Sequence, residues 1–300
     1  MSHLSFTPSE LSPKKLHSFL LGGIAPRPIA FASTIDLEGR VNLAPFSYFN
    51  VFSANPPILI FSPARRGRDN TTKHTLDNVL AVPEVVVNLV DFNLVHACSL
   101  ASTDYAAGVN EFKKAGLTEI PSDTIAPPRV MESPVSFECK VLRVDSFGEN
   151  PGAGNLVVCE IHRIHFREDV LDSDGLPDAH LLDLVGRCGG SHYVRASGDA
   201  LFEIPKPVSN LGIGVDNLPK DIRLSRILTG RHLAMLGNIE SLPDETDVNE
   251  YKLMELSSIF MDHCDDGETL EKELHLHSAR LLDNGNVNEA WKTLLSFNLG

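Results

Sequence analysis

The chain has 300 residues, of which 42% are hydrophobic and 22% are charged, a composition typical of a soluble globular protein with a substantial core. Its formal net charge of −14 at pH 7 argues against a nucleic acid or an anionic membrane as a partner, because both bind clusters of lysine and arginine. The apolar runs are too short to span a bilayer and no signal-like segment opens the chain, so we expect a cytoplasmic protein.

Short strand-like segments dominate the first two thirds of the chain. Apolar patterns predict strands at residues 28–35, 41–49, 58–62, 84–90, 136–147 and 156–166. Short helices are expected between them, at residues 73–81, 93–101 and 108–115. The Pro/Gly loop at residues 150–154 predicts a hairpin between the last two strands. Many short strands without alternating helices indicate a closed antiparallel barrel rather than a doubly wound sheet.

The pattern changes near Pro205-Lys206-Pro207, where we place a boundary between a first domain, 1–205, and a C-terminal extension, 206–300. Apolar spacing predicts helices at residues 250–264, 269–282 and 287–296. The segment 221–236 is compatible with either a helix or a strand. We interpret this region as an acidic, largely helical extension that packs on the barrel or on a second subunit.

A basic loop, Arg65-Arg66-Gly67-Arg68, precedes the first predicted helix. Thr71 or Thr72 is placed to cap that helix, and a helix N-terminus with basic neighbours binds phosphate readily. Lys73 and Thr75 add a charge and a hydroxyl to this end. The alternatives are a solvated surface loop and an ordinary capped helix without a ligand.

The segment Asn42-Leu43-Ala44-Pro45-Phe46-Ser47 carries small and amide-bearing side chains at alternating positions. Small side chains allow an aromatic ring to lie against the backbone, whose N–H and C=O groups then reach polar ring edges. Pro45 has no N–H for a sheet ladder, so it indicates a sheet edge or a bulge. The alternative is an irregular strand end that binds nothing.

The cysteines and histidines predict no metal site. The five cysteines form no Cys-x-x-Cys pair, and Cys139 and Cys159 fit buried strand positions. His162 and His165 would face opposite sides of a strand, and the pair His275 and His277 diverges on a helix.

Several segments together resemble the flavin reductase-like family, the FMN-binding split barrels related in fold to pyridoxamine-phosphate oxidases. The resemblance covers roughly residues 15–205 and rests on PRPIA at 26–30 with ST at 33–34, NLAPFSYFN at 42–50, KHTLDN at 73–78, and the stretches 111–117 and 134–140. It implies a mainly β (α+β) fold, an FMN-binding split β-barrel of Greek-key type with peripheral helices. It also implies a homodimer with FMN near the subunit interface.

The same resemblance nominates residues for FMN binding. Those expected near the isoalloxazine ring and ribityl chain are Ser33, Thr34, Asn42, Ala44 and Ser47. Those expected at the phosphate are Ser62, Lys73, Thr75 and Asn78, and we add Arg66 from the basic loop.

The chain departs from the family at two positions near the phosphate end. The family commonly has an acidic residue where this chain has His74, and a basic one near Asp77. The segment 184–193 resembles a late Gly-Gly-x-x-Tyr stretch of the family, and it brings Arg187, His192 or Tyr193 into consideration near the flavin or its partner.

The resemblance implies an FMN-dependent oxidoreductase of the NAD(P)H:flavin reductase type. NADH or NADPH would supply electrons through FMN to an unidentified acceptor, and a separate monooxygenase is one candidate partner. Hydride transfer to flavin requires no side-chain acid or base, so we nominate no catalytic residue. One alternative is a non-catalytic FMN-binding or electron-carrier protein. Another is an interaction protein that acts through its acidic helical C-terminal region.

Overall fold

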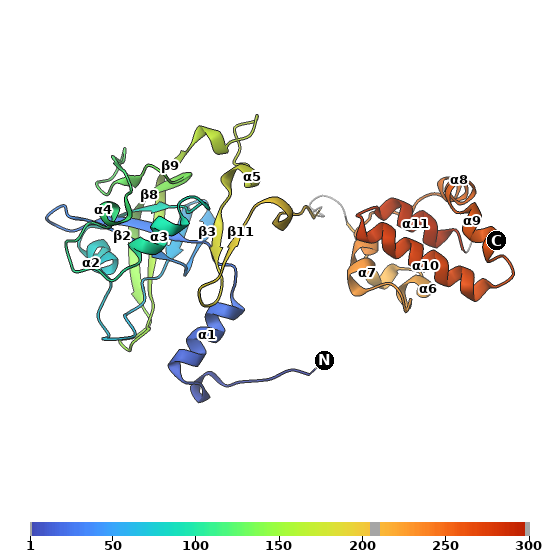
Figure 1. The fold of residues 1–300 in the computed structure, drawn as a ribbon, viewed down its shortest axis with the longest axis horizontal. Helices are drawn as coiled ribbons and strands as arrows, with labels where there is room; N and C mark the ends of the chain where they lie inside the picture. The colour runs from blue at the N-terminus through green and yellow to red at the C-terminus, as the bar shows by residue number, and fades with distance from the viewer. Residues whose placement is uncertain (1, 205–210, 298–300) are drawn as a thin grey trace. The chain divides into compact units, whose positions relative to one another are not determined.

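The computed structural model describes residues 2–204 and 211–297. The chain divides into two compact units, Met1–Phe202 and Glu203–Gly300, which we call the first unit and the helical unit (Figure 1). The expected boundary at Pro205 lies outside the described residues. Among the described residues, no helix combines the length and the apolar character that a membrane crossing requires.

The first unit is built on one seven-stranded sheet in which every neighbouring pair of strands is antiparallel. In spatial order its strands are β2 (Val41–Phe46), β1 (Ala30–Ile35), β5 (Glu84–Asn88), β8 (Val135–Ser146), β9 (Asn155–Phe166), β4 (Pro57–Phe61) and β3 (Phe49–Ala54). Two small ladders accompany it, β6 (Glu119–Ile120) with β7 (Arg129–Val130), and β10 (Val185–Arg187) with β11 (Tyr193–Arg195). The expected antiparallel pairing and the hairpin between residues 146 and 155 are confirmed, whereas the predicted closure of the strands is not seen in the strand order, which leaves β2 and β3 as edges.

The two edge strands of this sheet, β2 and β3, follow one another in the chain. The prediction of one strand at residues 41–49 is wrong, because β2 ends at Phe46 and β3 begins at Phe49 on the opposite edge. Pro45 lies on an edge strand, as its missing N–H indicated. The chain crosses between the edges at Ser47 and Tyr48, where the Tyr48 carbonyl accepts a hydrogen bond of 2.9 Å from the Ser62 N–H.

Helices pack on both faces of strand β1. Ala30 and Ala32 face one core cluster with Leu76 and Val79 of α2 (His74–Ala81). The alternate residues, Ile29 and Phe31, face a second cluster. That cluster is covered by α3 (Val95–Ala101) and α4 (Glu111–Ala115), which start two and three residues later than predicted.

Helix α1 (Pro13–Gly23) was not predicted and lies at the periphery of the first unit (Figure 1). It buries none of its residues, although Leu16, Phe19 and Leu20 have the spacing of an apolar helix face. Its start does carry a signal, since Ser12 caps the N–H of Lys15 and Pro13 occupies the first turn.

The helical unit contains α6 (Lys220–Arg223), α7 (Gly230–Gly237), α8 (Glu245–Glu255), α9 (Ser257–Asp262), α10 (Gly267–Asp283) and α11 (Val287–Leu295). The ambiguous segment 221–236 therefore holds two short helices, and the single helix predicted at 250–264 is interrupted between α8 and α9. Trp291 is fully buried among these helices and donates a hydrogen bond of 3.1 Å to the Leu236 carbonyl.

Glu138 of β8 is a fully buried carboxylate in the first unit. Burial alone would raise its pKa, but hydrogen bonds from the Thr124 hydroxyl, from the backbone of Asp123 and Thr124, and from His165 hold the pKa of Glu138 at about 2. A carboxyl whose folded-state pKa is depressed stabilises the fold above its unfolded pKa, and that stability is lost as the pH falls toward the folded value.

We expect Glu138→Gln to lower the free energy of unfolding of the first unit by about 1–3 kcal/mol at neutral pH. The deficit relative to the wild type should shrink between about pH 5 and pH 2, because the wild type loses its carboxylate there. Hydrogen exchange of the β8 amides measures this, with Asp145→Asn, an exposed change on the same strand, as the control. A deficit that is the same at every pH would contradict the assignment.

Candidate functional site

Three neighbouring cavities surround the N-terminal end of α2. The largest, about 410 Å³, lies where α1, the end of β2 and the basic loop meet, and we call it the cationic cavity. Its lining residues are His17, Leu21, Pro45, Phe46, Ser47, Tyr48, Ser62, Ala64, Arg65, Arg66, Gly67, Arg68, Lys73 and Asp104.

The cationic cavity is positively charged in a strongly acidic chain. Four lysine or arginine side chains line it together with the carboxylate of Asp104, and Asp69, which lies outside the lining, also pairs with Arg68 at 3.0 Å. Desolvation by burial lowers the pKa of Lys73, and the nearby Arg66 cation lowers it further. The cavity therefore holds more positive charge than its own residues neutralise, which favours an anionic ligand.

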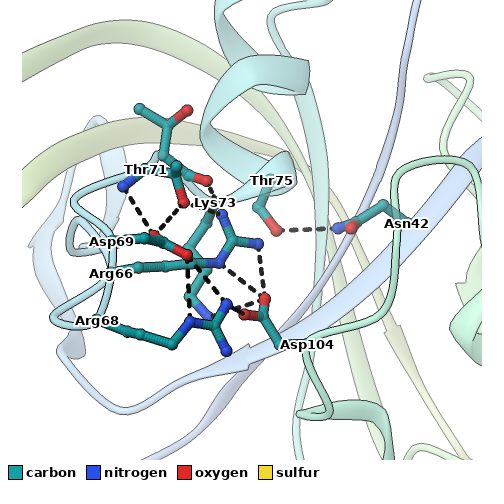
Figure 2. A network of polar contacts seen from close by, with 9 residues as sticks. Asn42, Arg66, Arg68, Asp69, Thr71, Lys73, Thr75 and Asp104 are labelled. Carbon is teal, nitrogen blue, oxygen red and sulfur yellow. Dashed lines mark hydrogen bonds and ion pairs between the residues drawn. The ribbon is translucent and has the colours of Figure 1, made fainter.

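Asp104 lies between the cations, as Figure 2 shows. Its two oxygens lie 2.7 Å from Arg66 Nε and 2.9 Å from Arg68 Nη2, and Lys73 Nζ is 3.9 Å away. The hydrogen bond from Arg66 is the main cause that lowers the pKa of Asp104, so the carboxylate is ionised. Arg66 is held independently by the Thr71 hydroxyl at 3.1 Å and by the Thr72 carbonyl.

The predicted capping of α2 by Thr71 or Thr72 is wrong. The N-cap residue is Lys73, which makes no side-chain capping bond, and the Thr71 hydroxyl instead donates to Asp69 at 2.6 Å. Within the described residues, the backbone N–H groups of His74 and Thr75 donate no hydrogen bond to the protein. These two donors and the positive end of the helix dipole are free to meet an anion.

A narrow second cavity of about 30 Å³ shares Arg66, Lys73 and Asp104 with the first. We call it the neck, since it has room for about one water molecule. Its other lining residues are Asn42, Ala44, His74, Thr75, Ala101, Ser102, Thr103, Tyr105 and Glu111. The Glu111 carboxylate accepts a hydrogen bond of 2.9 Å from the Leu43 N–H, and burial raises its pKa.

The third cavity, about 270 Å³, shares Asn42 and His74 with the neck. Its remaining lining residues are Asp36, Leu37, Glu38, Arg40, Val41, Asp77, Asn78, Ala81, Ala107, Gly108 and Val109. Two buried amides stand at its inner wall. Asn42 donates to the Thr75 hydroxyl at 2.9 Å, and Asn78 donates to the Thr34 hydroxyl at 3.0 Å (Asn42 and Thr75 in Figure 2).

The predicted FMN residues fall into groups around these cavities. Ser47, Ser62, Arg66 and Lys73 line the cationic cavity. Asn42, Ala44 and Thr75 line the neck, and Asn78 lines the third cavity. The remaining two line none of the three: Thr34 lies behind the two asparagines, and the buried Ser33 hydroxyl has no hydrogen-bond partner among the described residues.

Arg187, His192 and Tyr193 belong to the β10–β11 hairpin and line none of these cavities. The Arg187 guanidinium lies over the Tyr193 ring, 4.5 Å from its centroid, and donates to the Gly190 carbonyl. The backbone of Arg187 also pairs with that of Arg27, through hydrogen bonds of 2.9 Å and 2.8 Å.

Sequence reasoning missed Arg27, which connects α1 to the wall of the cationic cavity. Its side chain is 5% exposed and donates to the carbonyls of Leu21 and Ile24 and, at 3.3 Å, to the Ser47 hydroxyl. Its Nη2 atom is buried and has no hydrogen-bond partner in the part of the chain that the structure describes. The only sequence signal is its place in the PRPIA segment at residues 26–30, which overlaps the start of the strand predicted at residues 28–35.

Comparisons with known proteins find a family match and relatives that cover the first unit. Residues 22–186 match the flavin reductase like domain. An "Uncharacterized protein" of Aquifex aeolicus is 35% identical over 67% of this chain and 100% of its own length. Nitrilotriacetate monooxygenase component B from Bacillus cereus is 32% identical with a TM-score of 0.63, over 68% of this chain and 100% of that one. The 2-nitrobenzoate 2-nitroreductase of Pseudomonas fluorescens is 28% identical with a TM-score of 0.60, over 70% of this chain and 100% of that one.

The large antiparallel sheet is consistent with the fold of a protein from Shewanella frigidimarina that is described as a flavin reductase with split barrel domain, which is 22% identical with a TM-score of 0.57 over 68% of this chain and 100% of that one. The family match spans more than half of the chain, and the sequence motifs fall within it. The protein belongs to the flavin reductase-like domain family.

Proposed function

We propose that this protein is an FMN-dependent oxidoreductase of the NAD(P)H:flavin reductase type, which takes electrons from NADH or NADPH and passes them to a separate acceptor. The observation that carries the proposal is the cationic cavity, where four cations outnumber the two carboxylates of Asp69 and Asp104 that pair with them, beside two backbone N–H groups that are free within the described residues. FMN carries a phosphate at one end, and such a donor set suits a phosphate.

Different residues around the cavity would bind different parts of FMN. Arg66, Lys73 and the N-terminus of α2 would hold the phosphate, with the Thr75 hydroxyl beside them. Ser47, Ser62 and the small Ala44 side chain would flank the ribityl chain and the ring. When bound, FMN supplies hydride acceptance from a nicotinamide and onward electron transfer. The side chains named here bind and orient, and none is assigned a proton transfer.

Two further features of the proposal concern partners. Exposed apolar side chains lie on strands of the sheet at Val51, Phe52, Leu142 and Ile164, which supports a homodimer that covers them. The similarity to a monooxygenase component B supports a separate monooxygenase as the recipient of reduced flavin. The helical unit, with its own core around Trp291, is proposed as a distinct C-terminal domain.

The test is a titration of the purified protein with FMN, followed by flavin fluorescence, and then anaerobic addition of NADH or NADPH. Saturable binding and rapid loss of the oxidised flavin absorbance would support a reductase. Bound flavin that stays oxidised with both donors would instead identify a flavin-binding protein or an electron carrier. Absence of FMN binding would overturn the proposal.

We expect Asp104→Asn to tighten FMN binding by about threefold to tenfold. The change removes a carboxylate that competes with phosphate for Arg66 and Arg68, an effect on the order of 1 kcal/mol. Arg66 keeps its bonds to Thr71 and Thr72, so its position is preserved.

Fluorescence titration at low and high salt measures this effect, and the gain should decrease with added salt. The control is Asp145→Asn, which also removes a carboxylate paired with an arginine but lies outside the three cavities. Weaker FMN binding by Asp104→Asn would show that the carboxylate positions Arg66 instead of competing with the ligand.

A further inference from the structure

The helical unit lies beyond the part of the chain that belongs to the family. The family match ends at residue 186, before this unit begins. Aspartate and glutamate outnumber lysine and arginine in residues 211–297, so much of the negative charge of the chain is carried here. Flavin binding by the first unit does not explain the surface of the helical unit, which therefore needs an explanation of its own.

A groove of about 420 Å³ lies between α8 and α11, and we call it the acidic groove. Lys292 is the one cation among its lining residues, and Lys292 Nζ lies 4.0 Å from Asp247 Oδ2. The side chains of Glu250, Glu255 and Glu289 make no hydrogen bond or ion pair with the described residues. The full lining is Asp247, Glu250, Tyr251, Met254 and Glu255 of α8, with Glu289 and Lys292 of α11.

An aromatic ring stands among these carboxylates. Burial raises the pKa of Tyr251, a hydrogen bond with Thr293 opposes that rise, and the negative charges of Glu255 and Glu289 add to it. A carboxylate binds a guanidinium group through two parallel hydrogen bonds, and a tyrosine ring binds it through its face. The acidic groove therefore combines the two kinds of group that best bind an arginine side chain.

The acidic groove also has an exposed apolar part. Met254 lines it and is 78% exposed, and Leu253, its neighbour in the chain, is 75% exposed. Methionine is flexible and adapts its shape to different apolar partners. A small polyamine would neutralise the carboxylates but leave these apolar side chains in water, whereas a protein segment brings basic and apolar side chains together. The negative charge disfavours a nucleic acid or an anionic membrane.

We propose that the acidic groove is a docking site for an arginine-containing segment of a partner protein. Arginine side chains of that segment pair with Glu250, Glu255 and Glu289 and lie against Tyr251, and an apolar side chain beside them packs on Met254. The opposite charges also attract the partner over a distance, which makes association sensitive to salt. The inference does not depend on the proposed function, because all the lining residues belong to the helical unit.

The test is isothermal titration calorimetry of the full chain with a synthetic peptide of arginine, leucine and alanine, at low and at high salt. We expect one peptide to bind per chain. Glu250→Gln combined with Glu289→Gln should weaken binding by about tenfold at low salt and by less at high salt. Met254→Ala should weaken binding by about threefold to tenfold at both salt concentrations, because its contribution is apolar.

Two matched controls change the same residue types outside the acidic groove. Glu240→Gln combined with Glu268→Gln removes the same charge from exposed positions of the helical unit. Met261→Ala truncates a 71% exposed methionine on α9. Both controls should keep the wild-type affinity to within about twofold. The emission of Trp291, which is fully buried in the core of the helical unit, shows whether each variant remains folded.

The other possible occupants give different results. No binding of the peptide, or equal weakening by the glutamate pair and its control, would overturn the proposal. Spermidine that displaces the peptide, together with a Met254→Ala variant of unchanged affinity, would identify a small polycation as the ligand instead. If the groove variants leave the peptide affinity unchanged but dissociate a dimer in analytical ultracentrifugation, a second copy of the chain covers the groove and the proposal is also overturned.

Discussion

Arg66→Met is expected to weaken FMN binding by about two orders of magnitude, or roughly 3 kcal/mol. The Arg66 side chain is 12% exposed and lines both the cationic cavity and the neck, so its charge acts in a poorly solvated place. Methionine keeps much of the volume and loses the charge and the hydrogen bonds that a phosphate would receive. Fluorescence titration with FMN gives the Kd, and the flavin-free variant should remain folded.

A second variant separates loss of charge from movement of the loop, because Arg66 also holds Thr71 and Thr72. Lys73→Met removes a charge whose nearest ionic partner is Asp104 at 3.9 Å, and we expect it to weaken FMN binding by about tenfold. Arg143→Met, at a 63% exposed arginine outside the cavities, should leave the Kd unchanged. Unaltered FMN affinity in both Arg66→Met and Lys73→Met would place the phosphate elsewhere.

Arg27→Met is expected to lower both the stability of the first unit and its affinity for flavin. The guanidinium satisfies the carbonyls of Leu21 and Ile24 at the end of α1, and it donates to Ser47 in the cavity wall. Its loss leaves these acceptors without their donor, at a cost of about 2–4 kcal/mol in the free energy of unfolding. Helix α1 buries none of its own residues, so these hydrogen bonds help to hold it at the cavity wall.

Hydrogen exchange in β1 and β2 reports the stability of the first unit, whereas fluorescence of the single tryptophan, Trp291, would report the helical unit. Arg27→Lys should recover only part of the loss, since one ammonium group cannot reproduce the fork of donors that meets both α1 and Ser47. The control is Arg163→Met, at a 54% exposed arginine paired with Asp123. If Arg27→Met matched this control in both stability and FMN affinity, Arg27 would have no positioning role.

Local sequence patterns predicted most strands of the first unit, because each strand is a run of β-branched and apolar residues bounded by turn residues. The same patterns failed between Phe46 and Phe49. The aromatic residues there suggest one continuous strand, but β2 ends at Phe46 and β3 begins at Phe49 on the other edge of the sheet. No local pattern marks that crossing, because it depends on which strands lie at the edges. The cluster of cations was predicted for the opposite reason, since Arg65, Arg66, Arg68 and Lys73 are close together in the chain.

Sequence patterns could not predict which acidic residue pairs with those cations. Asp104 lies 38 residues from Arg66 in the chain and comes into contact only because the segment between α3 and α4 folds back over the start of α2. Its neighbours in the sequence are ordinary loop residues. The third cavity was missed for the same reason, since its wall joins the β1–β2 turn, α2 and the segment before α4.

The position of Pro45–Tyr48 has a consequence for how the first unit responds to its ligand. These residues join the two outermost strands of the sheet, and they form one wall of the cationic cavity. A molecule held there contacts the end of β2 and the link that leads into β3. Ligand binding then increases the free energy of unfolding of the first unit. Resistance to proteolysis should therefore rise with the logarithm of flavin concentration above the Kd.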